Sequence, residues 1–138
     1  MRTLITLSMI ALASAVFAQD KPVKILFDVT SSSEAVHATA MRHVSMMAQA
    51  YPQSQFEVVI YSGAIDMVRK DKSSVSDQIV ALKDNDNVTF KVCQATMKRH
   101  GLTQEDLLPG VGSVPDGILE IVQKQSEGWG YIKEAPNN

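Results

Sequence analysis

The feature that most constrains the fold is a regular alternation of short apolar runs with helix signals. Runs of mainly apolar residues at 23–29, 55–61 and 88–92 have the length and composition of strands buried in a parallel sheet. Two more strands are predicted at 111–114 and 129–133. Because strands that alternate with helices form right-handed βαβ units, the pattern predicts an α/β fold with a mainly parallel sheet of about five strands.

Four helices are predicted to connect these strands. The first begins at Ser31, because Ser31 and Glu34 have the spacing of a capping box. The last begins at Pro115 and ends at Gly128. Its inward-facing side chains are predicted to be Ile118, Leu119 and Val122. Residues 134–138 are predicted to form a disordered tail.

Residues 1–18 have the pattern of a secretory signal peptide. Arg2 gives a positive start, residues 4–17 are mostly apolar, and the small residue Ala18 stands at the cut position. The apolar stretch is short for a membrane span, although an uncleaved N-terminal anchor is the alternative. We therefore expect cleavage near Ala18, a periplasmic or secreted location without stable membrane insertion, and a single domain at 19–138.

Charge and residue spacing argue against several classes of ligand. The formal net charge of −2 is mildly acidic, and no dense basic stripe is present, so nucleic acid is not expected as a partner. No Cys/His cluster has the spacing of a zinc site. His37 and His43 lie roughly 120° apart around their helix, so each is interpreted as a surface or boundary residue. No metal or cofactor is therefore expected.

Cys93 is the single cysteine, so it cannot form an intramolecular disulfide. In an exported chain its thiol is inert, reactive, or linked to another chain. Cys93 stands between the strand at 88–92 and a helix predicted at 94–100, where N–H groups, the helix dipole and the basic residues at 98–100 would favour the thiolate. The alternative is a buried structural cysteine, which is common for this residue type.

Three segments are expected to meet at one edge of the sheet. Residues 28–33, 62–63 and 93–96 each follow a predicted strand. Ligands of open α/β sheets bind outside the carboxyl ends of the strands. This edge is therefore the predicted site, and Cys93 is its chemically distinctive residue.

Several runs along the chain match one known family. They are KILFDV at 24–29, FKVC at 90–93, GL at 101–102, DLLPGV at 106–111, VPDG at 114–117 and QSEGWGYIK at 125–133. In their order and spacing these runs resemble the DsrE/DsrF-like family, in its exported single-domain branch. The resemblance implies a three-layer α/β/α fold and a homotrimer or hexamer. Characterised members include sulfur-relay subunits in which a cysteine accepts and passes on persulfide sulfur, and Cys93 occupies the matching position.

Three functions remain open at this point. The first is a sulfur carrier, or sulfurtransferase component, in which Cys93 is the catalytic residue and receives sulfane sulfur as a persulfide from a donor for an acceptor protein. The second is a non-catalytic oligomeric binding or assembly module in which Cys93 is structural. The third is a redox sensor that acts through an intermolecular disulfide.

Overall fold

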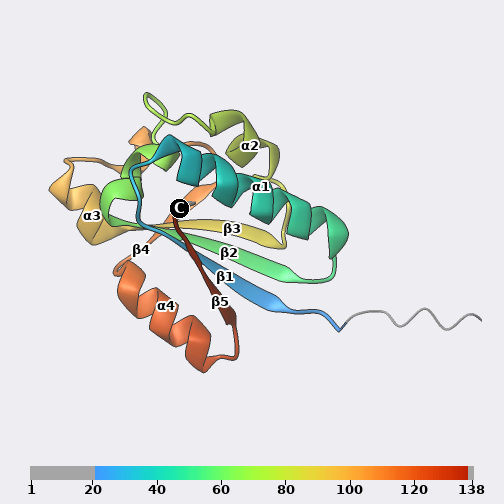
Figure 1. Ribbon diagram of the computed structural model, residues 1–138. Coiled ribbons are helices and arrows are strands. Elements are labelled where there is room, and N and C mark those ends of the chain that lie inside the picture. The colour runs from blue at the N-terminus through green and yellow to red at the C-terminus, as the bar shows by residue number, and fades with distance from the viewer. Residues whose placement is uncertain (1–20, 137–138) are drawn as a thin grey trace, which may run out of the picture.

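The computed structural model describes residues 21–136 as a five-stranded sheet with helices on both faces (Figure 1). The strand order is β4-β3-β2-β1-β5, and every neighbouring pair is parallel. The strands are β1 (Lys24–Val29), β2 (Gln55–Ile60), β3 (Val88–Cys93), β4 (Val111–Val114) and β5 (Gly130–Glu134). The predicted α/β class and the predicted parallel sheet are confirmed.

The helices form a layer on each face of this sheet. They are α1 (Glu34–Ala50), α2 (Ser76–Ala81), α3 (Gln94–Arg99) and α4 (Gly117–Ser126), with 3₁₀ turns η1 (Ser62–Val68) and η2 (Gln104–Asp106). Figure 1 shows α1 and α2 over one face and α4 over the other, with α3 beyond the carboxyl end of β3. The expected three-layer α/β/α arrangement is confirmed.

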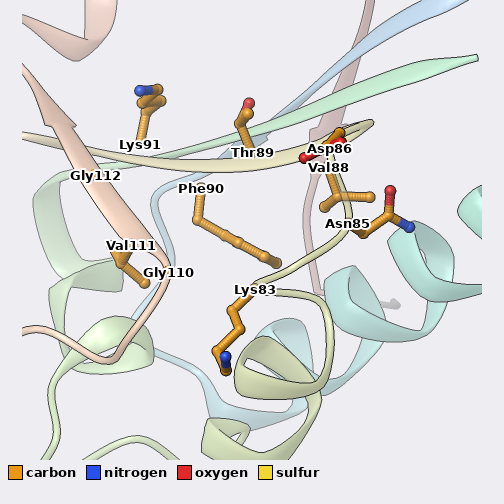
Figure 2. A pocket seen from close by; sticks show the side chains of 10 residues that line it. All are labelled: Lys83, Asn85, Asp86, Val88, Thr89, Phe90, Lys91, Gly110, Val111 and Gly112. Carbon is orange, nitrogen blue, oxygen red and sulfur yellow. The ribbon is translucent and has the colours of Figure 1, made fainter.

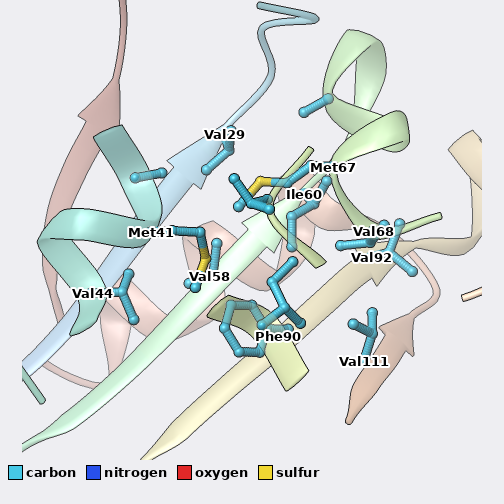
Figure 3. Packing of buried hydrophobic residues seen from close by; sticks show 14 of the residues in the cluster. Val29, Met41, Val44, Val58, Ile60, Met67, Val68, Phe90, Val92 and Val111 are labelled. Carbon is cyan, nitrogen blue, oxygen red and sulfur yellow. The ribbon is translucent and has the colours of Figure 1, made fainter. Parts of the chain in front are cut away.

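The main hydrophobic core lies between the sheet and α1. Phe27, Phe56 and Phe90 come from three adjacent strands, and each is buried almost completely. Met41 of α1 and Met67 of η1 belong to the same cluster (Figure 3). Since burial of one large apolar side chain stabilises a fold by about 1.5–3 kcal/mol, this face of the sheet supplies most of the hydrophobic stabilisation.

The face under α4 has a much smaller apolar cluster. Leu26, Val59 and Ile121 form its buried part. Asp28 and Glu57 lie on the same face, because alternate residues of a strand point to the same side of a sheet. Both carboxylates are buried, so α4 covers a layer that is partly polar.

Glu57 is linked to α4 by charge. Its Oε2 atom lies 3.4 Å from the Lys124 Nζ atom and accepts a hydrogen bond of 3.2 Å from the Thr89 hydroxyl. Burial raises the pKa of Glu57, and the neighbouring Glu120 carboxylate raises it further, whereas Lys124 lowers it. The helix is therefore held to the sheet by a polar cluster as well as by Ile121.

The prediction that Ile118, Leu119 and Val122 face the core is wrong, because all three side chains are exposed. Asp116 is the N-cap of α4, and its carboxylate accepts hydrogen bonds from the Ile118 and Leu119 N–H groups. With 3.6 residues per turn, Gly117, Ile121 and Lys124 share the side of α4 that faces the sheet, where Lys124 pairs with the buried Glu57, and Ile118, Leu119 and Val122 lie nearly opposite.

Two more expectations need correction, one about the start of α1 and one about the C-terminal tail. The α1 N-cap is Ser33 and not Ser31, because the Ser31 hydroxyl accepts a hydrogen bond from the Ser33 N–H group instead, at 3.1 Å. Glu134 does not belong to a disordered tail, because it ends β5 and is buried with its Oε1 atom 2.8 Å from His43 Nδ1. A hydrogen-bond partner on α1 therefore holds the end of β5 in place.

The predicted signal peptide at 1–18, and its cleavage near Ala18, lie outside the described residues. Within the described part of the chain, every helix is too short or too polar to cross a membrane.

A matched pair of substitutions tests how α4 packs. We expect Ile121→Ala to lower the free energy of unfolding by about 2–5 kcal/mol, because it removes a buried side chain. Ile118→Ala should change it by less than about 0.5 kcal/mol, because Ile118 is exposed. Urea denaturation of each variant, at a protein concentration where light scattering shows single chains, measures both. Equal losses would contradict the helix orientation described here.

Candidate functional site

The three predicted segments do meet at the carboxyl edge of the sheet. A methyl group placed on Gly63 would lie 3.0 Å from the Thr30 carbonyl oxygen, so the turns after β1 and β2 touch. The Ser62 N–H group donates a 3.2 Å hydrogen bond to the Thr96 hydroxyl, which joins the turn after β2 to α3. The prediction that this edge gathers residues 28–33, 62–63 and 93–96 is confirmed.

Cys93 stands at the junction of a strand and a helix, as predicted. It is the last residue of β3 and the N-cap of α3, with extended backbone angles (φ −70°, ψ 120°). The residue is free of disulfide bonds and retains an exposed fraction of 6%. A group that reaches its sulfur must therefore be small or approach through a narrow opening.

The surroundings of Cys93 make its thiol more acidic than usual. Burial by itself raises the pKa of the Cys93 thiol. The backbone N–H groups of Gly117, Thr96 and Ala95 and the Thr96 hydroxyl lower it by more than burial raises it, so the pKa lies below its ordinary value. The Cys93 side chain accepts no capping hydrogen bond at the start of α3. The effect instead comes from several N–H dipoles that converge on one sulfur.

The basic residues expected to favour the thiolate have a different place. Lys98 and Arg99 lie in the last turn of α3, and His100 follows the helix, so all three stand at the end opposite to Cys93. They are exposed. The main lowering contributions come from backbone N–H groups and one hydroxyl instead, which sequence spacing alone did not identify.

Gly117 is a site residue that sequence reasoning missed. It is the first residue of α4, and a methyl group placed on it would lie 3.2 Å from Cys93 Cβ and 3.3 Å from Tyr61 Cδ1. Both distances are shorter than ordinary carbon contacts, so a side chain here would push α4 away from the thiol. The glycine therefore allows the N-terminus of α4 to reach Cys93; the VPDG run at 114–117 was the available signal.

A cluster of phenols and charges lies beside the thiol, on the α4 face of the sheet. The Tyr131 hydroxyl donates a 2.6 Å hydrogen bond to Asp28 Oδ2, and Lys133 Nζ lies 3.2 Å from the same oxygen. Lys133 also donates to the Thr30 hydroxyl at 2.7 Å. The cluster joins β1, β5 and the turn after β1. It pairs Asp28 Oδ2, whereas the buried Asp28 Oδ1 atom has no hydrogen-bond partner in the described part of the chain.

Both phenols of this cluster stay neutral at physiological pH. The hydrogen bond to Asp28 raises the pKa of Tyr131 to about 12. Burial raises the pKa of Tyr61, and the negative charges of Asp28, Cys93 and Asp116 raise it further. The Tyr61 hydroxyl therefore stays uncharged in the neighbourhood of the Asp28 carboxylate and the Cys93 sulfur.

The histidines take other roles. His37 is buried, and its Nε2 atom lies 2.7 Å from the Ser31 carbonyl oxygen, so its interpretation as a surface or boundary residue was wrong. His43 pairs with Glu134, and His100 is exposed. Among residues 21–136, no group of three or more His, Cys, Asp or Glu side chains is placed to hold a metal ion.

A surface hollow of about 390 Å³ lies at the opposite end of β3 and β4 (Figure 2). Figure 2 shows Thr89 and Lys91 on one side of β3 and Phe90 on the other. The lining residues come from the amino-terminal parts of both strands and from the turn before β3. The hollow is therefore separate from Cys93, which ends β3.

The sequence matches the model of the DsrE/DsrF-like family over residues 11–133. The chain belongs to the DsrE/DsrF-like family. This family is related to sulfur-relay proteins, so the family resemblance noted in the sequence is confirmed, and with it a general relation to sulfur handling. A search of curated proteins gave no significant match.

Two solved structures resemble this DsrE/DsrF-like chain. The protein of unknown function MTH1491 from Methanobacterium thermoautotrophicum is 30% identical with a TM-score of 0.74, and the match covers 80% of this chain and 98% of that chain. The ychN protein from E. coli is 14% identical with a TM-score of 0.63, covering 81% of this chain and 97% of that chain. The second likeness shows the fold alone.

Gly117→Ala tests whether α4 contributes to the acidity of the thiol. We expect the pKa of Cys93 to rise by roughly one unit, because the added methyl group displaces the N–H group of residue 117 from the sulfur. The pH dependence of iodoacetamide alkylation, followed by intact-protein mass spectrometry, measures this shift. Gly130→Ala is the control, because its methyl group would meet its nearest neighbour at 3.7 Å. An unchanged pKa in a folded Gly117→Ala protein would contradict the assignment.

Proposed function

We propose that this protein is an exported sulfur carrier that accepts sulfane sulfur as a persulfide on Cys93. The observation that carries the proposal is the position of the single thiol, because Cys93 ends β3 and is the N-cap of α3, and a methyl group placed on Gly117 at the start of α4 would lie 3.2 Å from its Cβ atom. These surroundings place the pKa of the Cys93 thiol below its ordinary value. The thiolate is the form that attacks sulfur, and a low pKa increases its fraction at neutral pH. Membership of a family related to sulfur-relay proteins supports the same chemistry.

The transfer is a thiol–persulfide exchange and needs no oxidant. The Cys93 thiolate attacks the outer sulfur of a donor persulfide, R–S–SH, and forms a new S–S bond. The donor S–S bond breaks, and its electron pair leaves with R–S⁻. Cys93 then carries –S–SH, and attack by an acceptor thiolate on the outer sulfur regenerates the Cys93 thiolate. The N–H groups around Sγ stabilise the thiolate at the start and at the end of this cycle.

The limited exposure of Cys93 favours particular donors. An exposed fraction of 6% leaves room for a terminal sulfane sulfur but not for a bulky group directly at Sγ. Inorganic hydropolysulfide, or a persulfide at the tip of a partner protein, meets this requirement. The same burial is the observation that favours the second candidate function, in which the chain is a binding or assembly module and Cys93 only packs against Gly117 and Thr96.

Sulfur uptake separates the two candidates. After treatment with sodium polysulfide and removal of the excess, we expect wild-type protein to gain the mass of one or more sulfur atoms, released again by dithiothreitol. Cys93→Ser should gain none, because Cys93 is the single thiol. Intact-protein mass spectrometry of both proteins is the measurement. If native wild-type protein gains no sulfur while urea-unfolded protein does, Cys93 is structural and the carrier function is wrong.

We also propose that the chain assembles with copies of itself through the outer face of α4. The support is the exposure of Ile118, Leu119 and Val122, which are 62%, 52% and 57% exposed on one helix. A contiguous apolar stripe on a surface helix is typical of a protein–protein contact. The homotrimer or hexamer implied by the family resemblance would cover this stripe.

Leu119→Lys tests the assembly. We expect it to convert the oligomer into single chains at micromolar concentration, because a charge would be buried in the contact. Gln123→Lys is the matched control, since it places the same charge on α4 at an exposed polar position. Size-exclusion chromatography with light scattering gives the mass of each. A wild-type protein that is already a single chain, or a Leu119→Lys protein that stays assembled, would contradict this interface.

A further inference from the structure

A carboxylate is buried under α4 with one of its two oxygens unsatisfied. The Glu57 side chain of β2 is 3% exposed, and its Oε1 atom has no hydrogen-bond partner in the described part of the chain. Its Oε2 atom accepts a 3.2 Å hydrogen bond from the Thr89 hydroxyl and lies 3.4 Å from Lys124 Nζ. Because burial of a charge is costly unless its oxygens are paired, this environment favours the neutral acid.

Two carboxylates share the one ammonium group of Lys124. Its Nζ atom lies 3.4 Å from Glu57 Oε2 and 3.8 Å from Glu120 Oε1. The Glu120–Lys124 pair lies within α4, at i,i+4 spacing, whereas the Glu57–Lys124 pair joins α4 to β2. Glu120 is the less buried acid, with a side chain that is 17% exposed. A second negative charge so near favours protonation of the more buried carboxylate, which is Glu57.

The other charged side chains on this face of the sheet have contacts elsewhere. On β1, Asp28 Oδ2 lies 3.2 Å from Lys133 Nζ, and Lys24 Nζ lies 6.0 Å from the centroid of the tryptophan ring that precedes β5. On β3, Lys91 Nζ lies 3.2 Å from a methyl group placed on Gly112 of β4. The charged neighbours of the buried β2 carboxylate therefore come from α4.

We propose that Glu57 is a proton-operated tie between α4 and the sheet, which holds Lys124 across the two elements when it is ionised and releases Lys124 to Glu120 when it is protonated. The proton comes from the solvent and adds to a Glu57 oxygen, while Lys124 keeps its charge in both states. Burial raises the pKa of Glu57, and Glu120 raises it further, which moves this exchange toward neutral pH. The inference goes beyond the sulfur-carrier function, because neither Cys93 nor sulfur takes part.

The first experiment titrates the Glu57 carboxyl group directly. Protein labelled with ¹³C-glutamate is followed by NMR across a range of pH, and the Glu57 resonance is assigned by its loss in Glu57→Gln. We expect its midpoint to lie above the ordinary value of 4.5. Glu120→Gln should lower this midpoint, because it removes a neighbouring negative charge, and Lys124→Met should raise it, because it removes the positive partner.

The second experiment follows the release of Lys124 through tryptophan fluorescence. Trp129 is the single tryptophan, and Lys124 Nζ lies 4.6 Å from the centroid of its ring. Because the charge over the ring moves when Lys124 changes partner, the emission should change with the midpoint of the Glu57 titration. This transition should be lost in Glu57→Gln and kept in Glu127→Gln, the matched control at an exposed position after α4. Circular dichroism at each pH establishes that the proteins stay folded.

The outcomes decide the inference without reference to sulfur uptake. A Glu57 midpoint at or below 4.5, or shifts of the same sign in Glu120→Gln and Lys124→Met, would overturn the proton-operated tie. A fluorescence transition that persists in folded Glu57→Gln would also overturn it. If Glu57→Gln fails to fold, the opposite shifts of the remaining two variants decide the question. Since Cys93 is unchanged in every variant, the sulfur-carrier function can fail or stand separately.

Discussion

The structure depends on the way its parallel strands divide their side chains between two faces. One face receives Phe27, Phe56 and Phe90, and these pack under α1 into a large apolar core. The other face receives Asp28 and Glu57 as well as Leu26 and Val59, so it is only partly apolar. Because the first face carries most of the hydrophobic stabilisation, the second is free to hold polar groups. The thiol of Cys93 lies on this second face.

The connections of a parallel sheet then bring the site together. Every strand in this sheet runs in the same direction, so the turns after β1, β2 and β3 and the residues before α4 gather at one edge. Two helices begin at this edge beside Cys93, and the N–H groups of Ala95, Thr96 and Gly117 act on its sulfur. The thiol is nearly buried, and burial alone would raise its pKa. The convergent N–H groups lower the pKa by more than this, so the thiol is more acidic than an ordinary cysteine.

The helix α4 connects the chemistry of the site with the proposed assembly. Its first residue, Gly117, reaches the thiol, and its inner side is held by Ile121 and by the Lys124–Glu57 pair. Its outer side presents Ile118 and Leu119 to the surface. The proposed contact surface and the approach to Cys93 therefore lie on two sides of one helix.

The sequence by itself determined the elements and their order. The apolar runs identified β1, β2 and β3, because buried parallel strands need continuous apolar stretches, and the two edge strands were also predicted, at 111–114 and 129–133. Cys93 was correctly placed between β3 and α3. The turns that follow the strands were correctly predicted to meet, since parallel strands end at one edge. The family could be recognised from short runs whose order and spacing are maintained along the chain.

The tertiary structure decided the contacts on which the chemistry rests. The rotation of α4 depends on its contacts with the sheet, such as the Lys124–Glu57 pair and the packing of Ile121. An apolar stripe alone does not show which side of a helix meets a sheet that is itself partly polar. The approach of Gly117 to the thiol joins residues 93 and 117, and the link from Ser62 to Thr96 also spans separate elements. Such contacts arise only when the connections fold back over the sheet, so local spacing could locate the thiol but could not predict its acidity.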